Sequence, residues 1–490
     1  KDLSFNFSDT NQRQSLTEKI IKAKQEIEPA QKYLAKANEK LQAVVLADLP
    51  EEVRPAVSQL KEKLPLINKS LSQVNFWSDI FLEILGHQQA KKYLLIFQNT
   101  SEQRATGGFI GTYGLLDIDK GRIKNLQIDG IFNLDGQLYE KIVPPRPIQK
   151  ISTAWSTHDA NWFADWPTSA QKIMWFYEKA GGETVDGVFS LTPAVIERLL
   201  KITGPIDMPE YGVTLNSENF LDVTQYKVEF DYDKKLNQPK KILADFAPRF
   251  LDKLWEVWPS YYDKIIKIIS DSLAEKHILF YFTNKDLENV FIEQGWGGEV
   301  LATEKDYLMV VNTNINGFKT DKVIKQDIIH QSQIEEDGSI IDTVKIIRTH
   351  FGGQEPYDWY NKVNADYLRV FVPLGSELLF AEGHTLEGYA PPVDYEKLGF
   401  HYDKHVEQQQ SSMILDQKSG TQIFVESGKT VFGNWVYVSP GEKVEITYKY
   451  RLPFKINLIA SGTLNQASPV AIAAAISVLP TPVEKAPNAP

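Results

Sequence analysis

The sequence predicts a multidomain α+β protein with an N-terminal antiparallel helical hairpin, a central layered α/β domain and a C-terminal antiparallel β-sandwich. Three patterns predict this order. Apolar residues recur every three or four positions near the start, strands and helices alternate in the middle, and strand signals dominate the last part. A chain of 490 residues is also long enough for about three domains.

The predicted hairpin arm occupies residues 1–90. Apolar residues step by three and four through 20–44, and the stepping resumes through 53–74 after an Asp-Leu-Pro break. This spacing is typical of helices that pack along one stripe, so two helices of matching length are expected to fold back on each other. Pro29 and Pro65 lie inside these runs and are expected to kink or locally break them.

The central α/β domain is predicted for residues 91–293. Its strands are short apolar runs bounded by Gly, Asn and Asp, and its helices are amphipathic stretches between them. Strands are expected at 93–97, 108–118, 123–128, 185–191 and 278–282, and helices at 168–180, 193–202, 242–257 and 261–273. Alternation of this kind is typical of a sheet covered by helices.

A Gly-rich stretch at 294–298 is predicted to link this domain to a β-sandwich over residues 299–479. Strand signals recur there with turns between them, and helical periodicity is nearly absent. The expected strands are 307–312, 322–333, 340–349, 367–372, 422–425, 431–438 and 443–452. Residues 480–490 contain many prolines and are predicted to form an extended tail.

Composition excludes several functional classes. The formal net charge is −11, which disfavours binding to a phosphate backbone, so nucleic acid is not expected as a partner. The chain has no cysteine, which excludes disulfides, thiolate nucleophiles and Cys-type metal sites. Arginine, the side chain suited to bidentate phosphate recognition, is much scarcer than lysine.

The first candidate site is the polar turn that runs from Gln98 through Asn99 to Gly111, just after the apolar strand residues. It contains Arg104 and the glycine pair Gly107 and Gly108. A guanidinium beside backbone N–H groups of a glycine turn can bind an anion. The alternative interpretation is a structural turn in which the glycines supply positive φ angles.

The second candidate site lies in the segment 155–167, where three tryptophans surround polar residues. His158, Asp159, Asn161 and Asp165 could hold Mg²⁺ or Ca²⁺ or act as general acid and base groups. The alternative is a loop that caps the following helix, with the tryptophan rings in the core. Both interpretations remain open at this stage.

Several motifs resemble a bacterial family known as domain of unknown function 4012. They are TGGFIGTYGLL in the 94–116 block, HDANWFADWPTSA, VDGVFSLTP, LLKITGPI, DYLMVVNTNINGFKTDK, DWYNKVNADYLRVFVPLGSELL and ESGKTVFGNWVYVSPGEKVEITYKYRLPF. The resemblance implies an extracytoplasmic protein of the cell envelope or cell surface. It also implies that any membrane attachment comes from an N-terminal anchor that is not part of this chain.

A more distant similarity is to the LytR-CpsA-Psr envelope transferases, carried by the order of the glycine pair, VDGV, TGPI and LNSEN segments. Those enzymes attach lipid-diphosphate-linked glycopolymers to peptidoglycan with several arginines and a divalent metal. The similarity implies a diphosphate contact for Arg104, Mg²⁺ ligands at Asp159 and Asp165, and a base at His158 or Asp159. The chain departs from that pattern because His158 and Lys227 stand where arginines are expected.

Loss of preorganised cations is expected to leave little catalysis of phosphoryl transfer. We therefore expect a non-catalytic structural or interaction protein, with neighbouring subunits as partners in a surface assembly. The alternative is a metal-dependent phosphotransferase that takes a lipid-linked precursor or cell-wall glycopolymer, with Mg²⁺ as cofactor and Asn99, Gly107, Gly108, Asn161 and Lys227 as ligand contacts. A carbohydrate-binding module that uses exposed aromatic residues is the third alternative.

Overall fold

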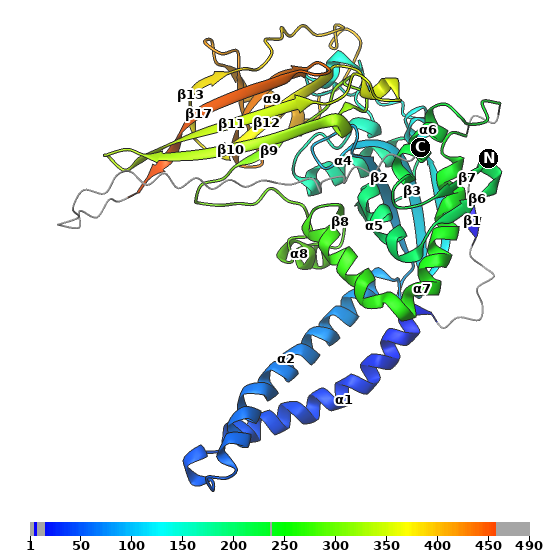
Figure 1. The fold of residues 1–490 in the computed structure, drawn as a ribbon, viewed down its shortest axis with the longest axis vertical. Helices are drawn as coiled ribbons and strands as arrows, with labels where there is room; N and C mark the ends of the chain where they lie inside the picture. The colour runs from blue at the N-terminus through cyan, green and yellow to red at the C-terminus, as the bar shows by residue number, and fades with distance from the viewer. Residues whose placement is uncertain (1–3, 7–14, 236–237, 457–490) are drawn as a thin grey trace, which may run out of the picture.

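The computed structural model describes residues 4–6, 15–235 and 238–456, and the predicted tail at 480–490 lies outside them. The predicted α+β mixture of helices and several sheets is confirmed. Figure 1 shows a helical arm that projects from an α/β layer, with two further sheets on the opposite side of that layer.

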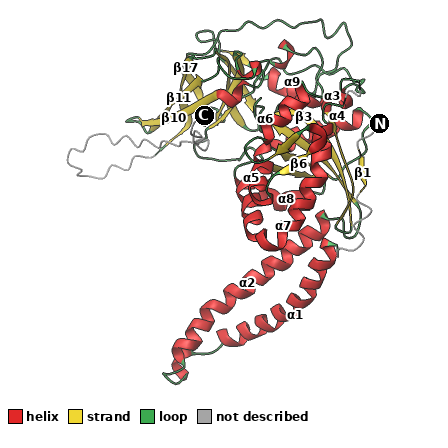
Figure 2. Cartoon of the chain, turned by 45° about the vertical axis from the view of Figure 1, so that its right-hand side comes forward, coloured by secondary structure: helices red, strands yellow, loops and turns green. Residues whose placement is uncertain are grey.

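The arm consists of α1 (Leu16–Gln42) and α2 (Arg54–Ile84), joined through a short 3-10 helix, η1 (Leu46–Asp48). The two helices run antiparallel side by side in both views (Figures 1 and 2). Ser15 and Glu18 form a capping box that satisfies backbone N–H groups at the start of α1. Each helix continues through its proline, so the predicted breaks at Pro29 and Pro65 do not occur.

The central layer is a six-stranded sheet in the order β1-β4-β3-β2-β5-β8. Only the β2–β5 pair is parallel, and the other neighbours are antiparallel. The strands are β1 (Ser4–Asn6), β2 (Lys91–Asn99), β3 (Phe109–Asp119), β4 (Arg122–Gly130), β5 (Gly187–Leu191) and β8 (Ile278–Phe282). Strand β1 was not predicted, and it lies within the range assigned to the arm.

Helices cover both faces of this sheet. One face packs against α4 (Trp166–Lys179) and the short α3 (Ile131–Asp135), with Trp155 fully buried between them. The other face packs against the end of α2, α7 (Lys241–Ala274) and α8 (Lys285–Glu293). Beside it, α5 (Pro193–Thr203), α6 (Phe220–Glu229) and the small sheet of β6 (Ile206–Met208) and β7 (Val213–Leu215) share another core with α7.

The C-terminal part contains two antiparallel sheets, in the orders β10-β11-β17-β13 and β14-β15-β16-β12-β9. Their inward side chains form one core, to which both sheets contribute. The strands are β9 (Met309–Val311), β10 (Ile324–Ile334), β11 (Ser339–His350), β12 (Asn364–Pro373), β13 (Glu377–Glu382), β14 (Ile414–Leu415), β15 (Gln422–Glu426), β16 (Lys429–Val438) and β17 (Lys443–Lys455). A short helix, α9 (Lys404–Ser411), packs beside them.

A continuous core joins the C-terminal sheets to the α/β layer. Tyr367 and Trp435 belong to the same buried cluster as Trp162. Arg369 of β12 is fully buried, donates to the Trp162 carbonyl at 2.7 Å and pairs with Glu426 at 2.9 Å. The guanidinium also stacks 4.3 Å from the centre of the Trp162 ring. The interface is therefore apolar with a paired charge at its centre, which favours a fixed arrangement of the two parts.

Candidate functional site

Arg104 lies at the centre of a buried ion cluster in the turn between β2 and β3. Its guanidinium contacts Oδ1 of Asp159 and the Glu102 carboxylate, each at 3.2 Å. It also donates to the main-chain carbonyls of Gln103 and Asn314, the latter in the C-terminal part of the chain. With 4% of its surface exposed, Arg104 is surrounded by protein acceptors and faces the ring of Phe109.

His158 connects Asp159 to Asp135 at the end of α3. Nδ1 of His158 lies 2.7 Å from Asp135, and Nε2 lies 3.2 Å from Oδ2 of Asp159. Burial lowers the pKa of His158, but the two neighbouring carboxylates outweigh it and raise that pKa to about 10. Burial also opposes ionisation of Asp159, yet the charges of Arg104 and His158 hold its pKa at about 2. Both groups are therefore charged at neutral pH.

The glycine pair forms a closed turn beneath this cluster. Gly107 has a φ of +140°, and a Cβ at Gly108 would come within 2.2 Å of the Asn99 carbonyl oxygen, so larger residues do not fit. The Gly108 N–H donates to the Gln98 side chain, and the amide of Asn161 donates to the Gly108 carbonyl. These N–H and carbonyl groups thus bind other protein groups.

The remaining predicted site residues lie in separate contacts. Asp165 caps α4 through the Thr168 N–H, and its other oxygen accepts from the Val300 N–H. The Asn99 side chain accepts from Ser101 and Gln225, and Lys227 pairs with Asp231 at the end of α6. The structure therefore brings Arg104, His158 and Asp159 together and places Asp165 and Lys227 in other pairs. A Mg²⁺ role for Asp159 and Asp165 stays a prediction.

Lys240, which no motif of the sequence marks, is a partly buried cation close to Glu229 and Lys319. Its ammonium lies beside Gly111 of β3, where an added Cβ would meet it. Burial lowers the pKa of Lys240 to about 8, although Glu229 acts in the opposite direction. Glu229 forms an ion pair with Lys319 at 3.1 Å. A lysine directly before a long amphipathic helix is the only sequence signal for this position.

The arrangement contains as many carboxylates as cations. Arg104 and His158 face Glu102, Asp159 and Asp135, while Lys319 and Lys240 face Glu229. Burial raises the pKa of Glu102 above its ordinary value, because it outweighs the opposing effect of the Arg104 and Lys319 charges. A site that stabilises a diphosphate needs cations whose charge is directed at the ligand. Here, paired carboxylates neutralise most of the positive charge before any ligand binds.

A cavity of about 220 Å³ lies at the join between the α/β layer and the C-terminal sheets. It is lined by Arg146, Lys150, Glu387, Tyr389 and Trp435, among others. The Lys150 ammonium lies 4.5 Å from the centre of the Trp435 ring and pairs with Glu387. Lys150 therefore lies over the Trp435 ring, which is itself buried.

Two further findings concern whether a helix could cross a membrane and which known proteins or families resemble the chain. In the described part of the chain, none of the helices combines the length and hydropathy needed to cross a bilayer. No curated protein matches the chain. Residues 88–228, which run from β2 to α6 and include Arg104, His158 and Asp159, match the model of a family described as a protein of unknown function, DUF4012.

Proposed function

We propose that this chain is an extracytoplasmic protein of the cell envelope with a non-catalytic structural or interaction role in a surface assembly. In this proposal the central layer is a LytR-CpsA-Psr-like scaffold and the two C-terminal sheets form a β-sandwich. An anchor outside the chain would attach it to the membrane, and neighbouring subunits would be its partners.

The single observation that carries the non-catalytic role is the engagement of Arg104. Its guanidinium is buried and faces two carboxylates and two main-chain carbonyls of the protein. A ligand diphosphate would have to displace these acceptors, which would take Arg104 away from the partly buried Glu102 and leave Asp159 with His158 alone, at a cost of several kcal/mol. The contact to the Asn314 carbonyl instead makes Arg104 a clamp between the two parts of the chain.

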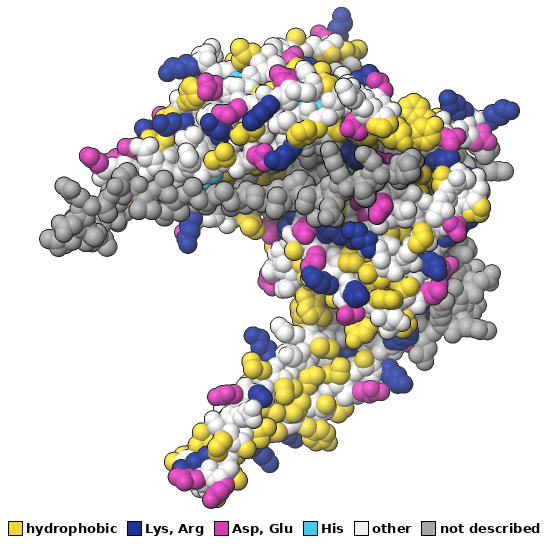
Figure 3. All heavy atoms as spheres, in the orientation of Figure 1, with side chains coloured by type: hydrophobic (Ala, Val, Ile, Leu, Met, Phe, Trp, Pro, Cys, Tyr) yellow, Lys and Arg dark blue, Asp and Glu magenta, His cyan; other side chains and the backbone are white. Residues whose placement is uncertain are grey.

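The arm supports the interaction role through a stripe of apolar side chains with a period of seven. Leu60, Ile67, Val74 and Phe81 of α2 are each between 45% and 51% exposed, although α1 packs beside them. Figure 3 shows hydrophobic side chains gathered along the arm. A seven-residue repeat is typical of helices that pack along a coiled-coil seam. Two hairpins that meet along this stripe would form a four-helix bundle, so a second copy of the chain is the proposed occupant.

Substituting the stripe is expected to weaken self-association. In sedimentation velocity across a concentration series, the full chain should dimerise, and Ile67→Lys or Val74→Lys should raise the dissociation constant about tenfold or more. Leu66→Lys is the matched control because Leu66 is 64% exposed but lies off the stripe. A wild-type chain that stays monomeric at high concentration, or a control as disruptive as the stripe variants, would contradict the proposed occupant.

The second candidate function is metal-dependent phosphotransfer from a lipid-linked glycopolymer. The observation that favours it is the ammonium of Lys240, whose pKa is lowered to about 8 and which lies beside Gly111 of β3, near Glu229 and Lys319. In this alternative, Lys240 and Lys319 would contact the diphosphate, and Arg104 would only position the turn.

Calorimetry with farnesyl diphosphate and Mg²⁺ separates the two candidates. The non-catalytic proposal expects no saturable binding, with the same result for wild type and Lys240→Met. Saturable binding that Lys240→Met abolishes, while Lys253→Met on the exposed side of α7 leaves it unchanged, would replace the proposal with the phosphotransferase.

A further inference from the structure

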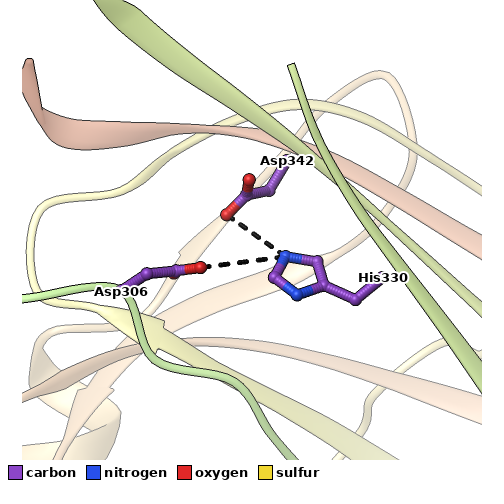
Figure 4. Close-up of side chains that lie close together, drawn as sticks. All are labelled: Asp306, His330 and Asp342. Carbon is purple, nitrogen blue, oxygen red and sulfur yellow. Dashed lines mark ion pairs between the residues drawn. The ribbon is translucent and has the colours of Figure 1, made fainter. Parts of the chain in front are cut away.

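Three potential metal-ligating side chains converge at one end of the C-terminal sheets. Asp306, His330 and Asp342 each offer one ligand atom, and these atoms lie within 4.8 Å of one another (Figure 4). Nε2 of His330 lies 3.3 Å from Oδ2 of Asp342 and 3.9 Å from Oδ2 of Asp306. Figure 4 shows the two carboxylates pointing at the same edge of the imidazole ring.

The strand register explains how these residues meet. Asp342 pairs with Ser332 of β10 and Tyr450 of β17, so His330 is its diagonal neighbour on the same face. Asp342 occupies an inward position, in line with the core residues Val344 and Ile346. Asp306 comes from the segment just before β9.

The buried groups of this cluster lack hydrogen-bond partners. The Asp342 side chain is 0% exposed, and neither of its oxygens accepts a hydrogen bond. Nε2 of His330 and the hydroxyl of Tyr450 are also buried without a hydrogen bond. Burying an ionised carboxylate is strongly unfavourable without compensation, and here the compensating positive charge can come from the His330 imidazole at 3.3 Å or from a bound cation that both residues ligate.

The Asp306 carboxylate is already oriented to act as a metal ligand. Its Oδ1 accepts the Tyr307 N–H at 2.7 Å, which fixes the carboxylate and leaves Oδ2 directed at His330.

We propose that Asp306, His330 and Asp342 form a binding site for one divalent transition-metal ion of the Zn²⁺ type. One imidazole and two carboxylates suit such an ion better than Mg²⁺ or Ca²⁺, which prefer oxygen ligands alone. Asp306 is partly exposed, with 35% of its side chain accessible, so water can complete the coordination shell. The ion would tie the segment that enters β9 to strands β10 and β11.

The test is calorimetric titration of the untagged, chelator-treated full chain with ZnCl₂. We expect one Zn²⁺ per chain and an increase in melting temperature on loading. His330→Gln and Asp342→Asn should each weaken binding at least tenfold and remove the increase. Asp327→Asn, an exposed carboxylate on the same strand paired with Lys325, should behave as wild type.

A metal-free comparison shows whether lost binding reflects a lost fold. Because Asp342→Asn removes a buried charge whose oxygens accept no hydrogen bond, metal-free Asp342→Asn should melt close to the temperature of metal-free wild type. Three outcomes would overturn the proposal: no one-to-one Zn²⁺ binding by wild type, retained binding in both ligand variants, or saturation by Ca²⁺ or Mg²⁺ in preference to Zn²⁺.

Discussion

Replacing Arg369 with methionine is expected to lower the free energy of unfolding by about 3–5 kcal/mol. Methionine fills much of the same volume but leaves the buried Glu426 without its ion partner and the Trp162 carbonyl without its donor. Denaturant unfolding followed by tryptophan fluorescence measures the loss, because Trp162 lies directly under the guanidinium.

Two variants test whether the buried charge of Glu426 causes the loss of stability. Arg451 also pairs with a glutamate, Glu377, but 45% of its side chain is exposed, so Arg451→Met should cost about 1 kcal/mol or less. Adding Glu426→Gln to Arg369→Met should recover part of the loss, because the stranded charge is removed. Equal costs for Arg369→Met and Arg451→Met would contradict the role assigned to burial.

Raising the pH above neutrality is expected to destabilise the fold through His158. The folded state holds this proton up to a pKa of about 10, whereas an unfolded histidine releases it near 6.5. Between these values the unfolded state binds fewer protons, so the free energy of unfolding falls by up to about 1.4 kcal/mol per pH unit. Below pH 6.5 the charged His158 contributes its full stabilisation of the folded state.

The difference between wild type and His158→Gln isolates this effect from other titrating groups. Unfolding curves at several pH values should show that difference shrinking as the pH rises towards 10. A constant difference for His158→Gln would show that the Asp135–His158–Asp159 contacts do not hold the proton.

The elements with strong periodicity were predictable from sequence, and the short ones were not. The helix expected at 168–180 is α4 (Trp166–Lys179), and the stretches at 242–257 and 261–273 are the two halves of α7, which is interrupted at Tyr261. Strand β1 has only three residues, so its periodicity gives no signal, and its place depends on pairing with β4. Local pattern cannot specify such pairing.

Side-chain contacts between distant segments are likewise not specified by local sequence pattern. Arg104 and Asp159, from two segments that the sequence marked as separate candidate sites, lie in contact, and a further partner of Arg104, Asn314, comes from a distant part of the chain. The sequence does contain one signal for the proposed metal site. Asp342 alternates with Val344 and Ile346 on the inward face of its strand, and a carboxylate on such a face needs a partner.

Both ends of the arm are fastened to one β-turn. The Thr17 hydroxyl at the start of α1 donates to the Lys120 carbonyl, and the N–H groups of Lys120 and Gly121 donate to the carbonyls of Gly86 and Leu85 just after α2. At 1.5 Å per residue, the 27 residues of α1 make a rod about 40 Å long. A sideways force on its tip would therefore act as torque on the turn between β3 and β4, and the protein would transmit mechanical load along those strands.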